Sequence, residues 1–272
     1  LRIVMALVEQ GTLRLDTTAR SLLGEDLPLV GDGVTVEHLL AHRSGIGDYL
    51  DEGSGCDVRD YVLSVPVHEL ATAEAYLRVL DGRPSVFAPG ERFTYNNSGY
   101  VLLAVLAERA AGTDLPTLVS DLVCDPAGMP DTDFLRTDSL PGRAAVGYLD
   151  ATGLRTNVLH LPVRGSGDGG TYSTLADLHA LWSALFAGQI VAPPLVAELL
   201  RPRSDWPQES RRYGLGFHLA AAGDAVYMEG YDAGVSFLSL HQPSTAITYT
   251  ILANWSEGAW PMIRLLDERL GT

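Results

Sequence analysis

The side chains that can accept a proton in this chain are those of His, Tyr, Asp and Glu, because all of its 19 basic residues are arginine. Arginine stays protonated in proteins, whereas lysine can lose its proton and act as a base or nucleophile. No serine therefore has a lysine three residues later, and no G-x-S-x-G motif is present. His160, His179, His218 and His241 lack the spacing of metal ligands, so we expect no metal and no other cofactor.

The composition predicts a large globular unit. The 272 residues are 46% hydrophobic, which is enough to bury a substantial core. The formal net charge of -15 repels nucleic acids and anionic lipid surfaces, so neither is an expected partner. Charges, Gly or Pro interrupt every apolar run before the ~20 residues of a membrane span. No leader pattern is visible, which predicts a cytoplasmic location for the chain as given, and export of a longer precursor stays open. Cys56 and Cys124 are expected to be reduced.

Hydrophobic periodicity predicts that the first part of the chain is helical. Residues 1–10 are apolar on all sides, as in a buried helix, and Gly11 is a suitable stop. From about residue 16 to 165, short helical stretches alternate with Pro- and Gly-rich loops. The clearest of these helices are expected at 99–111 and 115–122.

The rest of the chain predicts an antiparallel sheet covered by helices. Thr174 and Asp177 have capping-box spacing for a helix that runs to about residue 187, and 259–270 predicts an amphipathic helix. Between these helices, alternating or β-branched runs predict strands at 213–220, 225–229, 235–241 and 246–253. The expected fold class is α+β, one domain over 1–272 with a helical lobe at about 16–165 and a sheet lobe from 1–15 and 166–272.

Several segments, taken in order, resemble the serine β-lactamase and penicillin-binding-protein family, in its class C and esterase-like branch. The ordered set covers nearly the whole chain and is far more specific than any one motif. Its members are LVEQGTLRLD at 7–16, VTVEHLLAHRSGIGDY at 34–49, FAPGERFTYNNSGYVLLAVLAERAAG at 87–112, DPAGMPDT at 125–132, GGTYSTLADL and YGLGF.

The resemblance implies acyl-transfer chemistry on a β-lactamase/transpeptidase-like fold, an antiparallel sheet flanked by helices with a large helical insertion. In the family, a serine attacks a carbonyl group, and backbone N–H groups hold the oxyanion. A lysine three residues later and the tyrosine of a Tyr-x-Asn motif handle the proton. Tyr95 and Asn97 occupy the Tyr-x-Asn positions. The same register places the Ser-x-x-Lys motif about two helical turns before Leu1, so this motif and the family's N-terminal strands are expected to lie outside the chain as given.

The family's third motif, Lys-Thr-Gly or His-x-Gly, corresponds by resemblance to Met228, Glu229 and Gly230, which we predict to contact substrate. Methionine carries no charge and donates no strong hydrogen bond, so we expect weak recognition of a substrate carboxylate. Glu229 would repel that group if it faced the site. The alternative roles are a buried aromatic for Tyr95, a turn or cap for Asn97 and a solvated charge at a strand end for Glu229.

Three residues near these motifs are expected to be structural. Ser44, in the HRSG segment, is predicted to be a turn residue and not a nucleophile. His42 is predicted to be a hydrogen-bonded turn residue. Ser98 is predicted to cap the helix at 99–111.

Two functions stay open at this point. The first is a serine hydrolase acting on a β-lactam, a D-Ala peptide or an ester, with its Ser-x-x-Lys motif upstream, which the abrupt beginning of the chain favours. The second is a catalytically silent homologue that binds a small acyl or peptidoglycan-type ligand or a protein partner, which Met228 favours. Whether the chain is an enzyme therefore depends on a nucleophile that it lacks. The strand at 246–253 is expected to be an unprotected edge, which the C-terminal helix covers or a second copy pairs with, giving a homo-oligomer.

Overall fold

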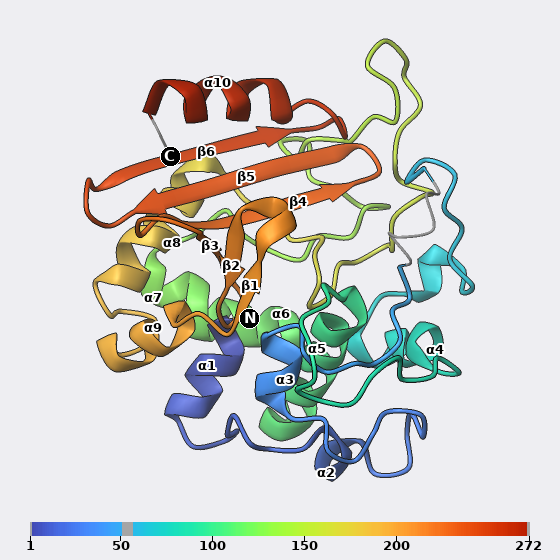
Figure 1. The fold of residues 1–272 in the computed structure, drawn as a ribbon. Helices are drawn as coiled ribbons and strands as arrows, with labels where there is room; N and C mark the ends of the chain where they lie inside the picture. Colours follow the sequence, from blue (N-terminus) through green and yellow to red (C-terminus); the bar gives the residue numbers. More distant parts are fainter. Residues whose placement is uncertain (1, 51–56, 271–272) are drawn as a thin grey trace.

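The fold combines a helical part with one antiparallel sheet, as a computed structural model that describes residues 2–50 and 57–270 shows (Figure 1). The first half of the chain forms helices α1 (Arg2–Glu9), α2 (Ala19–Leu23), α3 (Val36–Leu40), α4 (Leu77–Leu80), α5 (Asn97–Ala111), α6 (Leu115–Val119) and α7 (Asp125–Ala127). The second half forms helices α8 (Leu175–Phe186), α9 (Pro193–Leu200) and α10 (Trp260–Leu270) and all the strands. The predicted α+β class is confirmed.

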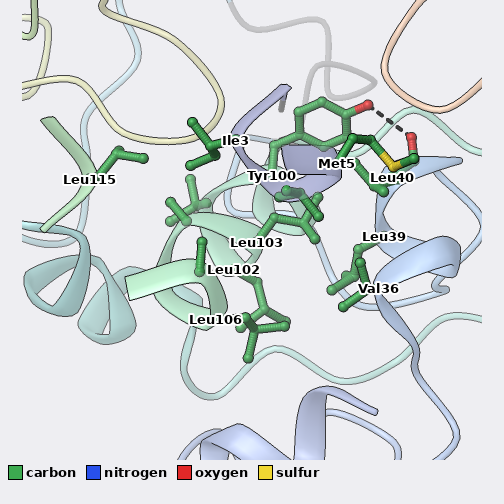
Figure 2. Close-up of a cluster of buried hydrophobic side chains, with 14 of the residues drawn as sticks. Ile3, Met5, Val36, Leu39, Leu40, Tyr100, Leu102, Leu103, Leu106 and Leu115 are labelled. Atoms are coloured by element: carbon green, nitrogen blue, oxygen red, sulfur yellow. Dashed lines mark hydrogen bonds between the residues drawn. The ribbon is translucent and has the colours of Figure 1, made fainter. Parts of the chain in front are cut away.

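Helix α5 forms the centre of the helical part because it is apolar on all sides. Every residue from Asn97 to Ala107 is buried, and α5 contacts α1, α2, α3 and α6. Burying one large aliphatic side chain stabilises the fold by about 1.5–3 kcal/mol, so this cluster fixes the position of α5 firmly. Figure 2 shows side chains that meet there, namely Ile3, Met5, Val36, Leu39, Leu40, Tyr100, Leu102, Leu103, Leu106 and Leu115.

The predicted helices are present, with shifted ends. Helix α1 confirms the buried helix at 1–10, since Ile3 to Leu7 are all buried. Helix α5 begins two residues before the predicted start. Helix α6 ends at Val119, and a π-helical turn (Ser120–Cys124) separates it from α7, where the N–H of Asp125 bonds the carbonyl of Ser120. Cys124 is buried and free, and burial raises the pKa of its thiol to about 11. Cys56 lies outside the described residues.

The sheet has six antiparallel strands in the order β1-β2-β3-β4-β5-β6, so each strand pairs with its neighbour in sequence. They are β1 (Ser204–Trp206), β2 (Arg211–Tyr213), β3 (His218–Ala220), β4 (Val226–Asp232), β5 (Val235–Gln242) and β6 (Ile247–Ala253). The single strand predicted at 213–220 is wrong. Gly216 has a φ of 87°, and the N–H of Gly214 bonds the carbonyl of Phe217, which turns the chain between β2 and β3.

Helices cover both faces of the sheet. On one face, α8 contacts β6, and the indole N–H of Trp182 donates to Oγ of Ser239 at 2.8 Å. On the other face, Ile263 of α10 packs against Leu238 and Leu240 of β5. Figure 1 shows α10 beside β6, the last strand of the sheet. No helix in the described part of the chain is long and apolar enough to cross a membrane.

Candidate active site

The N-terminus of α5 is held by two side chains from outside the helix. Asn96 is the cap, because its Oδ1 accepts from the N–H of Gly99 at 2.8 Å. The carboxylate of Asp48 accepts from the N–H groups of Asn97 and Ser98, both at 2.9 Å. The N–H groups and the dipole of a helix start favour an anion, and here the carboxylate of Asp48 takes that place. The prediction that Ser98 is the cap is wrong, since its hydroxyl instead donates to Asp48.

Tyr95 precedes this helix start and lies among aromatic rings. Its ring centre is 4.3 Å from that of His42 and 6.4 Å from those of Trp206 and His218. The last two rings are nearly parallel to Tyr95, at 19° and 18°. Tyr95 is half-buried, whereas Asn97 is buried. The sequence missed Trp206 and His218 as neighbours of Tyr95.

Strand β4 forms the opposite wall and carries the three residues predicted to contact substrate. Gly230 lies opposite Phe237, and a Cβ at this glycine would come 2.6 Å from the Phe237 ring, so a larger residue would have to displace that ring. Met228 is two residues away on the same face of the strand, with its Sδ 2.6 Å from Nη2 of Arg2. Glu229 points to the other face. It forms an ion pair with Arg211 at 2.6 Å, so it is a half-buried, paired charge and not a solvated strand end.

A cavity of about 1500 Å³ joins these walls. Its lining includes all five residues predicted from the sequence, Tyr95, Asn97, Met228, Glu229 and Gly230. It also includes residues that the sequence analysis did not select, among them Arg2, Tyr49, Asp168, Trp206 and His218. Whether the five perform chemistry stays a prediction. All five line one cavity, although the side chain of Glu229 points to the other face of β4. Ser44 is not on this lining and is buried in its turn.

The ionisable groups of the cavity have shifted pKa values because burial disfavours their charged forms. Burial lowers the pKa of His218 to about 4, so its imidazole is neutral at pH 7. Burial also lowers the pKa of Arg2 to about 10, which leaves its guanidinium charged. Burial raises the pKa of Asp168 to about 6. The cavity therefore holds a cation beside Met228 and an anion at Asp168.

In residues 2–50 and 57–270, no cluster of three or more His, Cys, Asp or Glu side chains has a geometry that could hold a metal ion. The cavity lining presents phenol, amide, neutral imidazole, guanidinium and carboxylate groups, together with the hydroxyls of residues such as Ser166 and Thr132.

The fold, with Tyr95 and Asn97 at the start of its central helix, defines a protein of the β-lactamase and penicillin-binding-protein class. The penicillin-binding protein from Bacillus halodurans has this fold, with a TM-score of 0.91 and 33% sequence identity. The similarity covers 98% of this chain and 82% of that one. Residues 3–270 match the family described as Beta-lactamase, and the chain belongs to that family. The resemblance noted in the sequence is confirmed.

Two relatives of known sequence carry names of this class, an esterase and a penicillin-binding protein. Esterase EstB of Burkholderia gladioli is 38% identical over 162 residues, which are 54% of this chain and 38% of the esterase. Penicillin-binding protein 4* of Bacillus subtilis (strain 168) is 28% identical over 243 residues, 83% of this chain and 52% of its own length. The chain thus spans about half or less of the length of these relatives.

Proposed function

We propose that the cavity between α5 and β4 binds a small acyl compound, an ester or an amide, through its carbonyl group. The observation that supports this proposal is the placement of Tyr95 and Asn97 on the same cavity lining as Gly230, which comes from a distant segment of the chain. The names of the relatives, an esterase and a penicillin-binding protein, indicate ester and β-lactam carbonyls. Tyr95 would place a phenol, and Asn97 an amide, next to that carbonyl.

We propose that acyl transfer needs a nucleophile and a base in addition to a cavity that binds the carbonyl group. A nucleophile and a base must lie within hydrogen-bond reach of one another. None of the serines in the 272 residues has a lysine three positions later. We therefore propose that the 272 residues bind acyl compounds without forming a covalent acyl-enzyme.

The second candidate is a protein in which binding has replaced catalysis altogether. The observation that favours it is Met228, which stands where the resemblance places a cationic or hydrogen-bonding side chain. In the structure Arg2 supplies a guanidinium beside this methionine. The positive charge is thus present at the site, but α1 carries it and not β4. A charge in this place can bind a polar ligand as well as assist catalysis.

The test combines covalent labelling with direct binding. The 272-residue chain is incubated with a fluorophosphonate probe, p-nitrophenyl acetate and a chromogenic cephalosporin, and labelled peptides are sought by mass spectrometry. We expect no stoichiometric serine label. Phenyl acetate is then titrated by two-dimensional NMR, and the amide signals of Asn97 and Gly230 are expected to shift. Stoichiometric labelling of one serine would show covalent catalysis, and no shift near these residues would contradict the binding proposal.

Tyr95→Phe provides the matched variant for the titration. It keeps the ring contacts with His42 and Trp206 and removes one hydroxyl, so we expect the unfolding free energy to change by less than about 1 kcal/mol. We expect weaker binding of phenyl acetate. Tyr249→Phe is the control, because Tyr249 bonds Asp267 of α10 and does not line the cavity. A large stability loss in Tyr95→Phe alone would instead indicate a structural role.

A further inference from the structure

Arg2 of α1 brings a guanidinium to the cavity lining and makes few contacts with it. Its Nη2 lies 2.6 Å from Sδ of Met228, a thioether that accepts hydrogen bonds only weakly. Its Nε is buried and has no hydrogen-bond partner in residues 2–50 and 57–270. The guanidinium also lies over the ring of Phe217, with 4.9 Å between its central carbon and the ring centre. Donors of Arg2 are therefore left for a ligand.

The charge of Arg2 is not neutralised by a carboxylate in the described part of the chain. Burial alone lowers the pKa of Arg2 to about 10, with no contribution from a neighbouring charge. Glu229 points to the other face of β4 and is already paired. Asp232 shares the face of Met228 but lies about 13 Å further along the strand, and Asp168 interacts with Asp232. Because a buried charge is costly unless it is paired, this end of the cavity favours an anionic ligand group.

An apolar wall begins next to this charge. It consists of Gly230, Phe237 and Leu252, which lie opposite one another across β4, β5 and β6 (Figure 1), together with Val235. Val235 is two residues from Phe237 and therefore on the same face of β5. All four residues line the cavity, and Leu252 and Val235 are 43% and 37% exposed. Large apolar side chains that stay exposed on one cavity wall indicate a place for an apolar ligand group.

The charge and the apolar wall are close enough for one small molecule to reach both. Met228, which contacts Arg2, and Gly230 are two residues apart on one face of β4, a distance of about 7 Å. Leu252 is two strands away from Gly230, about 10 Å at the usual spacing of strands. Met228 and Leu252 are thus separated by about 12 Å across the sheet. An alkyl chain of medium length with one charged end group covers this distance.

We propose that the cavity binds the anion of a medium-chain carboxylic acid, such as octanoate. The guanidinium of Arg2 donates hydrogen bonds to the carboxylate, whose planar shape it matches. The alkyl chain lies on the apolar wall and covers Leu252 and Val235. This ligand goes beyond the proposed function, because the charged end group is held at Arg2 and no carbonyl group at Tyr95 is needed. The anion is therefore preferred over a neutral acyl compound of the same shape.

The test of the charged end compares octanoate with octanamide by calorimetry on the full 272-residue chain. The two molecules have nearly the same shape, and only octanoate is charged. We expect octanoate to bind roughly tenfold more tightly, a typical size for charge-assisted hydrogen bonds. Arg2→Gln should remove this preference. Arg14→Gln should keep it, because Arg14 is exposed and outside the cavity lining, and the change in net charge is the same.

A comparison of octanoate with butanoate tests the apolar wall. Octanoate should bind roughly tenfold or more tightly than butanoate, because four more methylene groups leave water. Leu252→Ala should weaken the binding of octanoate roughly threefold or more and leave that of butanoate unchanged. Leu154→Ala is the control, since Leu154 is 87% exposed and outside the cavity lining.

The Nε–H signal of Arg2 in two-dimensional NMR reports where the charged end binds. We expect octanoate to shift this signal and octanamide to leave it in place. Equal affinities for octanoate and octanamide in the parent chain, or a preference that survives in Arg2→Gln, would overturn the inference. Equal affinities for octanoate and butanoate, or binding of octanoate without a shift of the Arg2 signal, would also overturn it. The phenyl acetate titration decides the proposed function separately.

Discussion

Nε2 of His42 lies 3.1 Å from the hydroxyl oxygen of Tyr213, which ties the turn after α3 to strand β2. Nδ1 of the same ring accepts from the N–H of Asn96 at 3.1 Å, so Nε2 carries the proton and donates to Tyr213. Tyr213 can then donate to Tyr100 at 2.8 Å, and Tyr100 donates to the carbonyl of Leu40 at 2.9 Å. This buried chain uses each donor once. It links the sheet to the segment that positions Tyr95.

Tyr213→Phe should destabilise the fold by about 1–3 kcal/mol, because it leaves the buried Nε2–H of His42 without an acceptor. Urea unfolding followed by circular dichroism measures the change. Tyr231→Phe is the matched control, since Tyr231 is 47% exposed and its loss of a hydroxyl should cost less than about 0.5 kcal/mol. Equal effects of the two substitutions would show that the chain through Tyr213 adds no stability.

Stability should fall as the pH is lowered below 6.5 because of two buried histidines. Burial holds the pKa of His42 well below 6.5 and that of His218 at about 4, whereas both titrate near 6.5 in the unfolded chain. Between these values the unfolded state binds more protons than the folded state. The unfolding free energy should therefore drop by up to about 1.4 kcal/mol per pH unit for each histidine. Urea unfolding at several pH values measures this slope, which His218→Gln should reduce.

Asp168 should act in the opposite direction over part of the same range. Its pKa is raised by burial to about 6, so between pH 6 and about 4 the folded state binds its proton more readily than the unfolded state. Asp168 thus adds stability on acidification and partly offsets the histidines. Asp168→Asn should make the fall in stability steeper than in the parent chain. An unchanged slope would indicate that Asp168 has an ordinary pKa.

Local sequence patterns were sufficient to predict the helices and strands that have strong hydrophobic periodicity and clear end signals. The predicted cap at Thr174 is confirmed, because its side chain accepts from the N–H of Asp177 and α8 follows. The side chain of Asp177 instead accepts from Thr132, so the reciprocal half of the capping box is not formed. Strand β1 was missed because it has only three residues and Pro207 follows it directly. Such a short strand exists through its pairing with β2, which no local pattern shows.

Only those residues of the candidate site that belong to sequence motifs could be predicted. Tyr95, Asn97 and the residues of β4 came from a resemblance that fixes their order in the chain. His218, Trp206 and Asp168 reach the same cavity through contacts between distant segments, and their local sequence contains no sign of this. Ser98 shows the same limit. Like a capping residue, Ser98 precedes an apolar run. Its hydroxyl, however, donates a hydrogen bond to Asp48 from a distant turn, and Asn96 caps the helix instead.

Gly167→Ala should destabilise the fold by about 1–3 kcal/mol or more, because its Cβ would overlap the carbonyl oxygen of Tyr100 in α5. The thermal midpoint, followed by circular dichroism, measures the loss. Gly142→Ala is the control, since a Cβ there meets nothing within 4 Å and its φ is not positive. A variant with an unchanged thermal midpoint would show that the loop around Gly167 adapts to the added methyl group.

The chain should associate through strand β6 as its concentration rises. In the described part of the sheet, β6 pairs with β5 alone, so its other side presents unpaired backbone groups. Helix α10 packs on one face of strands β5 and β6, where the hydroxyl of Tyr249 bonds Asp267. Over its described residues, it does not hydrogen-bond the backbone along the outer edge of β6. We expect light scattering over a wide concentration range to show dimers or larger species at the upper end.

Leu252→Lys should reduce this association, because Leu252 is a 43% exposed residue of β6 and a lysine on an edge strand opposes pairing with a second strand. Leu154→Lys is the matched control. Leu154 is 87% exposed and lies outside the strands, so it receives the same charge away from the edge. If association depends on the edge, only Leu252→Lys shifts the equilibrium towards monomer. A parent chain that stays monomeric at every concentration, or equal effects of the two lysines, would mean that β6 does not pair between copies.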